Sequence, residues 1–150
     1  MKGTVIIMAN WAEGEIGLRG AAHSIREFLL NAFEVKNAEC LKATNTEIEI
    51  SNMTFILREF KNSVITSDII KVNFKEELCD EEGNVTVFFP IACAWSLNLN
   101  DLIRLSKRYN LNVWIQVFET YVGFREEACV VAGEIVYYDH TSWDSYCGAW

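Results

Sequence analysis

Residues 13–33 read EGEIGLRGAAHSIREFLLNAF and carry the two clearest secondary-structure signals in the chain. In residues 13–19, Ile16 and Leu18 share one face and small or charged residues share the other, until a glycine ends the run. This alternation is typical of a short strand. Over residues 21–33 the apolar positions recur every three or four residues, which predicts a helix with one apolar stripe. The chain therefore begins its ordered part with a strand followed by a helix.

Working outward, alternating or β-branched runs predict strands over residues 47–50, 53–60, 85–95, 111–118 and 126–136. The first two are expected to form a hairpin through Ser51-Asn52. Pro90 indicates an edge position, a bulge or a break in its strand, and Gly133 indicates a bulge. Residues 61–78 fit neither period and are interpreted as a short helix followed by a strand.

A second helix begins at Asn98 or Asn100, because either side chain can cap it, and ends near Asn110. Its inward stripe contains Leu102 and Tyr109. Two helices covering one face of a mostly antiparallel sheet define an α+β architecture. Without repeats or linkers, the prediction is one domain over residues 1–150, with an irregular middle segment inserted in the sheet.

The composition indicates a folded protein that stays in the cytoplasm. The 150 residues are 51% hydrophobic and 13% aromatic, enough for a sizeable core. The apolar run at residues 85–97 is shorter than the roughly 20 residues that span a bilayer, and residues 5–9 are too few for a signal peptide. Five cysteines without CxxC spacing are expected to be reduced and mostly buried.

The charge is negative, with 21 acidic against 13 basic residues and a formal net charge of −8. This balance repels phosphate backbones, so direct nucleic-acid binding is not expected. It suits a basic protein surface, including the nucleic-acid channel of another protein, although solubility alone also explains it. The acidic residues are densest in EELCDEEGN, residues 76–84, which is interpreted as a solvated hairpin loop.

Two groups of motifs resemble the YubB-type ferredoxin-like domain family of plasmid, phage and prophage proteins. Met8-Ala9-Asn10-Trp11, before a strand and helix, is similar to the family's M-x-N-W start. Ala94-Trp95-Ser96, a helix, an aromatic-rich strand and Tyr121-Val122-Gly123-Phe124 resemble its second half. The chain departs from the pattern at Ala12, where the family has a cysteine or polar residue, and at Leu97-Asn98, where it has two prolines.

The resemblance implies a ferredoxin-like split βαβ core and a role on mobile elements near genes that help incoming DNA survive. It implies no established reaction. Residues 1–7 precede the usual start of such proteins, so they are interpreted as an N-terminal extension or a longer first strand. The middle of the chain has no counterpart in the resemblance.

The candidate contact residues fall into an acidic group and an aromatic tail over residues 137–150. They are Glu47, Glu49, Glu76, Glu77, Asp80, Glu81, Glu82, Trp143, Tyr146 and Trp150. No catalytic residue, metal ligand or cofactor is predicted. A zinc site of Cys129, His140, Asp144 and Cys147 matches no zinc spacing, and a dyad of Cys93 or Cys129 with His140 has no local signature.

These observations predict a non-enzymatic mobile-element protein that binds another protein, in the host cytoplasm. Its acidic surface would imitate phosphates and inhibit a host defence or DNA-handling complex. One alternative is an enzyme or small-ligand binder with a pocket on the open sheet face, lined by Trp95, Trp114 and Phe118. Another is a structural homo-oligomer assembled through the aromatic tail.

Overall fold

The computed structural model describes residues 11–34, 40–51, 55–57, 60, 62–67, 69–75, 78–94, 96–121 and 123–142. In this part of the chain the order of elements begins with β1 (Trp11–Ala21), α2 (Ala22–Asn31), β2 (Phe33–Glu34), β3 (Leu41–Ala43), β4 (Glu47–Ser51), β5 (Phe55–Leu57) and β6 (Ser63–Ile65). It continues with β7 (Ile69–Asn73), β8 (Asn84–Ala94), α3 (Leu99–Tyr109), β9 (Asn112–Glu119), β10 (Phe124–Val131) and β11 (Glu134–Ser142).

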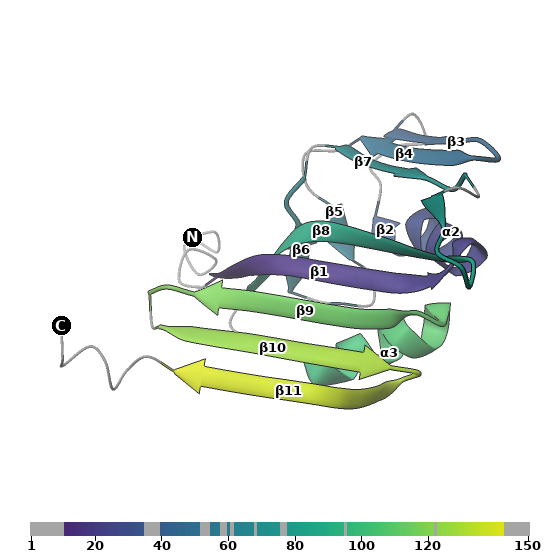
Figure 1. Cartoon of the computed structure of the whole chain (residues 1–150). Coiled ribbons are helices and arrows are strands. Elements are labelled where there is room, and N and C mark those ends of the chain that lie inside the picture. The colour runs from purple at the N-terminus through teal and green to yellow at the C-terminus, as the bar shows by residue number, and fades with distance from the viewer. Residues whose placement is uncertain are drawn as a thin grey trace.

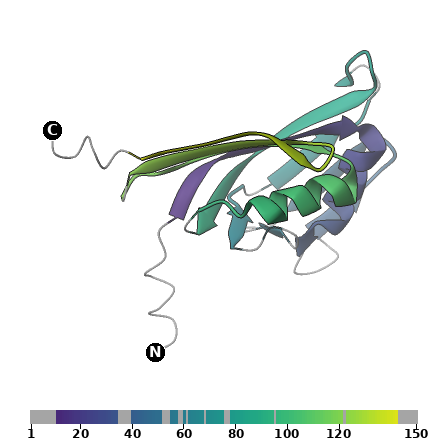
Figure 2. The same ribbon diagram turned by 90° about the horizontal axis from the view of Figure 1, so that it is seen from below.

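The strands form two sheets (Figure 1). The larger has eight strands in the order β11-β10-β9-β1-β8-β6-β5-β2, and the smaller has three in the order β3-β4-β7. All of these neighbours pair antiparallel. Figure 2 shows both helices on the same side of the large sheet. The α+β class with a mostly antiparallel sheet is therefore confirmed.

β1 lies inside the large sheet, between β8 and β9. β1 pairs with β8 along its whole length and with β9 from Glu13 to Arg19. Ile16 and Leu18 are fully buried on the helix side. Since α3 joins β8 to β9, the strands on either side of β1 are connected by a helix that covers them.

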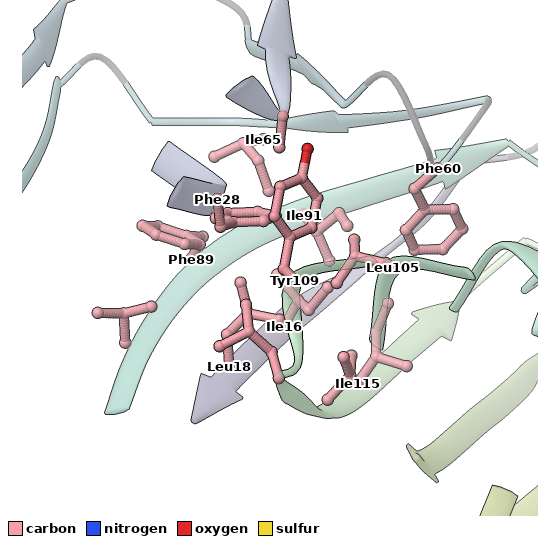
Figure 3. Packing of buried hydrophobic residues seen from close by; sticks show 14 of the residues in the cluster. Ile16, Leu18, Phe28, Phe60, Ile65, Phe89, Ile91, Leu105, Tyr109 and Ile115 are labelled. Atoms are coloured by element: carbon pink, nitrogen blue, oxygen red, sulfur yellow. The ribbon is translucent and has the colours of Figure 1, made fainter. Parts of the chain in front are cut away.

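The core is formed by this face of the large sheet, the two helices and the buried residues of β4 and β7 (Figure 3). Phe28 of α2 meets Tyr109 of α3 edge to face, with ring centroids 5.4 Å apart. Asn98 caps α3 by accepting a hydrogen bond from the Asp101 N–H, and Asn110 ends it in the left-handed conformation with φ of 55°. The predicted ends of this helix are confirmed.

The hairpin predicted through Ser51-Asn52 is wrong. β4 pairs with β3 and β7 in the small sheet, whereas β5 pairs with β2 and β6 in the large one. The turn residues joined two strands of different sheets, which local turn chemistry cannot reveal. The helix predicted within residues 61–78 is also wrong, because the described part of this segment forms β6 and β7. The strand predicted there is confirmed.

The acidic loop does not close a hairpin of paired strands. β7 pairs with β4, and β8 pairs with β1 and β6, so the loop crosses from the small sheet to the large one. Pro90 lies inside β8 without breaking its register with β1. Its carbonyl accepts a hydrogen bond from the Thr66 N–H just beyond β6, so its ring nitrogen points to the side where that ladder ends.

The single long strand predicted over residues 126–136 is wrong. β10 ends at Val131 and β11 begins at Glu134, with Ala132 and Gly133 both at positive φ, 52° and 77°. Two such residues form the tight turn that matches the twist of a hairpin. Gly133 is thus a turn residue, and the register shift lies at Cys129/Val130.

Candidate functional site

The side of the large sheet opposite α2 and α3 is called the open face. The strand register places its outward side chains in rows, three of which cross β8, β1, β9, β10 and β11. From one side to the other the rows are Ala92-Glu13-Phe118-Arg125-Thr141, Pro90-Glu15-Gln116-Glu127-Asp139 and Phe88-Gly17-Trp114-Cys129-Tyr137. Aromatic and acidic side chains therefore lie in adjacent rows.

Gly17 is the centre of the aromatic row. Without a side chain there, the rings of Phe88 and Trp114 meet edge to face above β1, with centroids 6.4 Å apart and an interplanar angle of 77°. A Cβ at this position would lie 2.8 Å from the Phe88 ring and 3.4 Å from the Trp114 ring. Gly17 therefore forms the floor between the two aromatic residues.

A hollow of about 490 Å³ opens at this point of the face. It is lined by Glu15, Gly17, Leu18, Arg19, Thr86, Phe88, Asn112, Val113, Trp114, Cys129 and Val131. Phe88 is 56% exposed, which is unusual for so large an apolar side chain. The volume falls within the range of roughly 300–1,000 Å³ that ligand pockets occupy. We call this feature the aromatic hollow.

The Trp114 indole is held in place from the neighbouring strand. Its Nε1–H donates to Glu127 Oε2 at 2.7 Å. Arg125 donates to Asp139 at 2.6 Å and lies 3.8 Å from Glu127. Thr141 and then Arg125 lower the pKa of Asp139, because both donate hydrogen bonds to its carboxylate. The carboxylates of β10 and β11 on this face are thus engaged within the protein.

The carboxylates of β1 are arranged differently. Glu13 and Glu15 are exposed, and their side chains form no ion pair or hydrogen bond with the described residues. The open-face arginines do not neutralise them, since Arg19 pairs with Asp80 and Arg125 pairs with Asp139. Two uncompensated negative charges therefore lie beside the aromatic hollow.

Glu47 and Glu49, the predicted contact residues of the small sheet, lie among cations. Glu49 is directly opposite Lys71 on one side and Lys42 on the other, and Lys71 approaches Glu47 at 3.7 Å. Cross-strand pairs of opposite charge cancel most of the field that an approaching partner would experience. This face does not form an acidic patch.

The acidic side chains of the loop differ in whether they are engaged in contacts within the protein. Asp80 accepts from the N–H groups of Glu82 and Asn84, both at 2.9 Å, and pairs with Arg19. These contacts, the backbone bond from Asn84 first, lower the Asp80 pKa. Glu81 and Glu82 are exposed. Glu76 and Glu77 lie outside the described residues.

The aromatic tail is described as far as Ser142, and its start pairs with β10 as strand β11. Tyr137 faces the open side, while Tyr138 faces the helix side and donates to Glu126 at 2.6 Å. Burial, and then this bond, raises the pKa of Tyr138 to about 12. The same carboxylate is buried and accepts from the Leu97 N–H at 3.0 Å. Trp143, Tyr146 and Trp150 lie outside the described residues.

The cysteine-based sites considered from the sequence do not assemble. Cys129 lies opposite Tyr137 on the open face, whereas His140 lies opposite Glu126 on the helix side and stacks on Phe124. Cys93 is buried, which raises the pKa of its thiol to about 12. In the part of the chain that the structure describes, no three histidine, cysteine or acidic side chains form a metal-binding group. Asp144 and Cys147 of the zinc hypothesis lie outside it.

The sequence pointed to this face only in part. Trp114 lines the hollow as the ligand-binder alternative expected, while Phe118 lies two rows from Trp114 and Trp95 falls outside the described residues. Gly17 and Phe88 were not anticipated. The available signal was a glycine at an outward position of a strand, which indicates the close approach of neighbouring side chains.

Three comparisons, with family models, with curated proteins and with solved structures, find no match to this chain. The resemblance to the YubB-type family therefore stays a prediction. Neither described helix has the length and apolar character needed to cross a membrane.

Proposed function

We propose that this chain is a non-enzymatic protein that acts by binding another protein through the open face of its large sheet. The observation that carries the proposal is the aromatic hollow beside the uncompensated carboxylates Glu13 and Glu15. Buried aromatic anchors dominate the energy of protein interfaces, and surrounding charge adds specificity and speeds association. The open face offers both within three adjacent rows.

The charge supports a basic partner. A chain with a formal net charge of −8 is attracted to the positive surface of a nucleic-acid-handling protein. The loop is a competing contact surface, because its exposed residues Glu81 and Glu82 could imitate phosphates. Lysines weaken the case for Glu47 and Glu49.

The biological setting of the proposal is a phage or plasmid protein that inhibits a host defence or DNA-handling complex in the host cytoplasm. It is supported by the motif resemblance and by the order β9-β1-β8-β6. In that order α2 follows β1, and α3 links the strands on either side of it. This is the arrangement expected of a ferredoxin-like split βαβ core carrying an inserted middle segment.

The proposal is tested by capturing the partner from plasmid-bearing host cells with the wild-type chain and three matched double variants. Glu13→Lys/Glu15→Lys reverses the charge of the open face. Glu81→Lys/Glu82→Lys reverses the charge of the loop, and Glu47→Lys/Glu49→Lys reverses the charge of these two positions in the small sheet. Each variant adds the same charge, so a non-specific charge effect would weaken all three equally. Circular dichroism and thermal unfolding check that each variant remains folded.

We expect loss of capture only in the open-face variant, and weaker capture at high salt. Loss only in the loop variant would instead assign the contact to phosphate mimicry by the loop. Capture that survives all three variants would reject an acidic contact surface.

A small-ligand binder is the second candidate, favoured by the volume and aromatic lining of the hollow. It predicts that a compound library raises the unfolding temperature of the wild-type chain but not that of a Gly17→Val variant, in which the floor is filled. Equal shifts in both proteins would place the ligand elsewhere.

A homo-oligomer is favoured by β11, which lies at the edge of the large sheet and exposes Ile135, Val136, Tyr137 and Tyr138. Light scattering of the wild-type chain, of a Val136→Lys variant and of a chain lacking residues 142–150 tests it. One unchanged mass in all three would reject it.

A further inference from the structure

We propose that the aromatic hollow binds an arginine side chain of the partner protein. The proposal rests on the function proposed above and names the group that the open face recognises. Three observations carry it: the apolar lining of the hollow, the fixed indole of Trp114 and the position of the uncompensated charge.

The hollow matches the long apolar stem of an arginine. Its walls include Phe88, Val131 and the exposed surface of Trp114, and Gly17 keeps its floor open. Methylene groups lose contact with water along such a wall while the charged end remains at the rim.

The Trp114 ring is held in a fixed geometry. The Trp114 indole is bonded to Glu127 and is in edge-to-face contact with Phe88. A guanidinium that lies over an indole gains a cation–π attraction, and tryptophan is the best partner for it. Because Glu127 already holds the indole, binding requires little ordering of the site.

The charge beside the hollow selects a cation. Glu15 lines the hollow, and Glu13 lies on the same face two residues away along β1. The arginine at the rim, Arg19, is neutralised by Asp80. An anionic group would be repelled by Glu15, and a purely apolar group would remove that carboxylate from water without a partner.

Arginine fits better than lysine for a geometric reason. Its planar guanidinium can stack on the indole and donate two parallel hydrogen bonds to a carboxylate, whereas an ammonium group cannot do both. Asn112 also lines the hollow, and an asparagine side chain can accept a further hydrogen bond.

The probe is a blocked pentapeptide with the sequence Gly-Gly-Arg-Gly-Gly, added to the whole ¹⁵N-labelled chain. Binding is followed by NMR through the indole N–H of Trp114, assigned with a Trp114→Phe variant. One anchoring side chain is expected to bind at roughly millimolar concentration. The same peptide with citrulline keeps the shape of arginine without its charge, and the same peptide with lysine keeps the charge without the plane.

We expect a saturable shift of the Trp114 indole signal with the arginine peptide and binding about fivefold or more weaker with citrulline. Glu15→Gln should weaken binding of the arginine peptide, whereas the matched variant Glu49→Gln should leave it unchanged. Gly17→Ala should also weaken it by narrowing the floor. If this variant does not fold, Glu15→Gln still decides the question.

Equal binding of the arginine and citrulline peptides would overturn the proposal, since the hollow would then select no cation. Saturation with the arginine peptide in Glu15→Gln at wild-type affinity would overturn it too, as would no shift at all in the folded wild-type chain. If partner capture still depends on Glu13 and Glu15 in that case, the open face remains the contact and only the arginine anchor fails.

Discussion

Replacing the buried residue Glu126 is the perturbation whose effect follows most directly from the structure. Its side chain joins three parts of the fold, because it lies on β10, accepts from the Leu97 N–H ahead of α3 and accepts from the Tyr138 hydroxyl of β11. Only 2% of Glu126 is exposed, so water cannot replace these partners. The carboxylate holds the edge strand and the start of α3 to the same point.

The Glu126→Gln variant keeps the shape but offers only one acceptor oxygen to two donors. The Tyr138 hydroxyl must then turn to accept from the new amide, and the second amide N–H is left without a partner, which costs about 1–3 kcal/mol of unfolding free energy for a buried group. In a chain of this size 1 kcal/mol corresponds to about 2–4 °C in Tm. The expected change is a decrease of roughly 2–12 °C.

Tyr138→Phe removes one donor from the same carboxylate. Because Tyr138 is 43% exposed, its loss should cost less, about 1 kcal/mol. In the double variant the two costs should not add, since the bond that both substitutions break is counted once. A coupling of at least about 0.5 kcal/mol is expected for residues in one hydrogen-bond network.

The assay is urea unfolding of the four proteins at neutral pH, followed by circular dichroism and tryptophan fluorescence. The matched control is Glu134→Gln, which changes an exposed glutamate at the start of β11 and should alter stability by less than about 0.5 kcal/mol. Strict additivity of Glu126→Gln and Tyr138→Phe, or no loss in Glu126→Gln, would refute the network.

Three further outcomes are expected. Gly14→Ala should destabilise the fold by more than about 3 kcal/mol in urea unfolding, since its Cβ would lie 1.8 Å from a backbone oxygen of β9. Gly17→Ala should cost only about 1 kcal/mol in the same assay, because its Cβ meets the edge of the Phe88 ring, which can turn. A thiol reagent should label Cys129 within minutes and Cys93 only on unfolding, because Cys93 is 1% exposed. The pKa of Asp139 is lower in the folded than in the unfolded chain, so its ionised carboxylate stabilises the fold above the unfolded pKa, and this stabilisation is lost as the pH falls through the folded pKa. Asp139→Asn should therefore make the free energy of unfolding less dependent on pH below about pH 4.

Local patterns were sufficient for the elements whose faces differ clearly. The strand containing Ile16 and Leu18 and the helix ending at Asn110 are confirmed, because burial on one face and a polar cap are encoded within a few residues.

Pairing between distant segments could not be predicted in this way. Residues 47–50 and 55–57 are close in sequence yet belong to different sheets, since their partners are β7 and β6. The turn at Ala132-Gly133 was missed because alanine rarely adopts positive φ, so the dipeptide carries only half of the usual signal. The start of the tail then belongs to β11, an edge strand of 9 residues. Exposed and buried positions do not alternate in its first half, which pairs with β10 near the register shift.

The candidate site was hard to predict because it depends on neighbours rather than on acidic density. The densest acidic segment contains Asp80, which is held by Arg19, and the Glu47–Glu49 pair is balanced by lysines. Glu13 and Glu15 are only two charges, but the strands on both sides of them, β8 and β9, present no charged side chain to the open face. The electrostatic field of a carboxylate whose nearest neighbours are neutral is not cancelled by an opposite charge close by. The sign of a contact surface on a sheet is therefore decided by the register across strands, which becomes visible only when β1 is placed between β8 and β9.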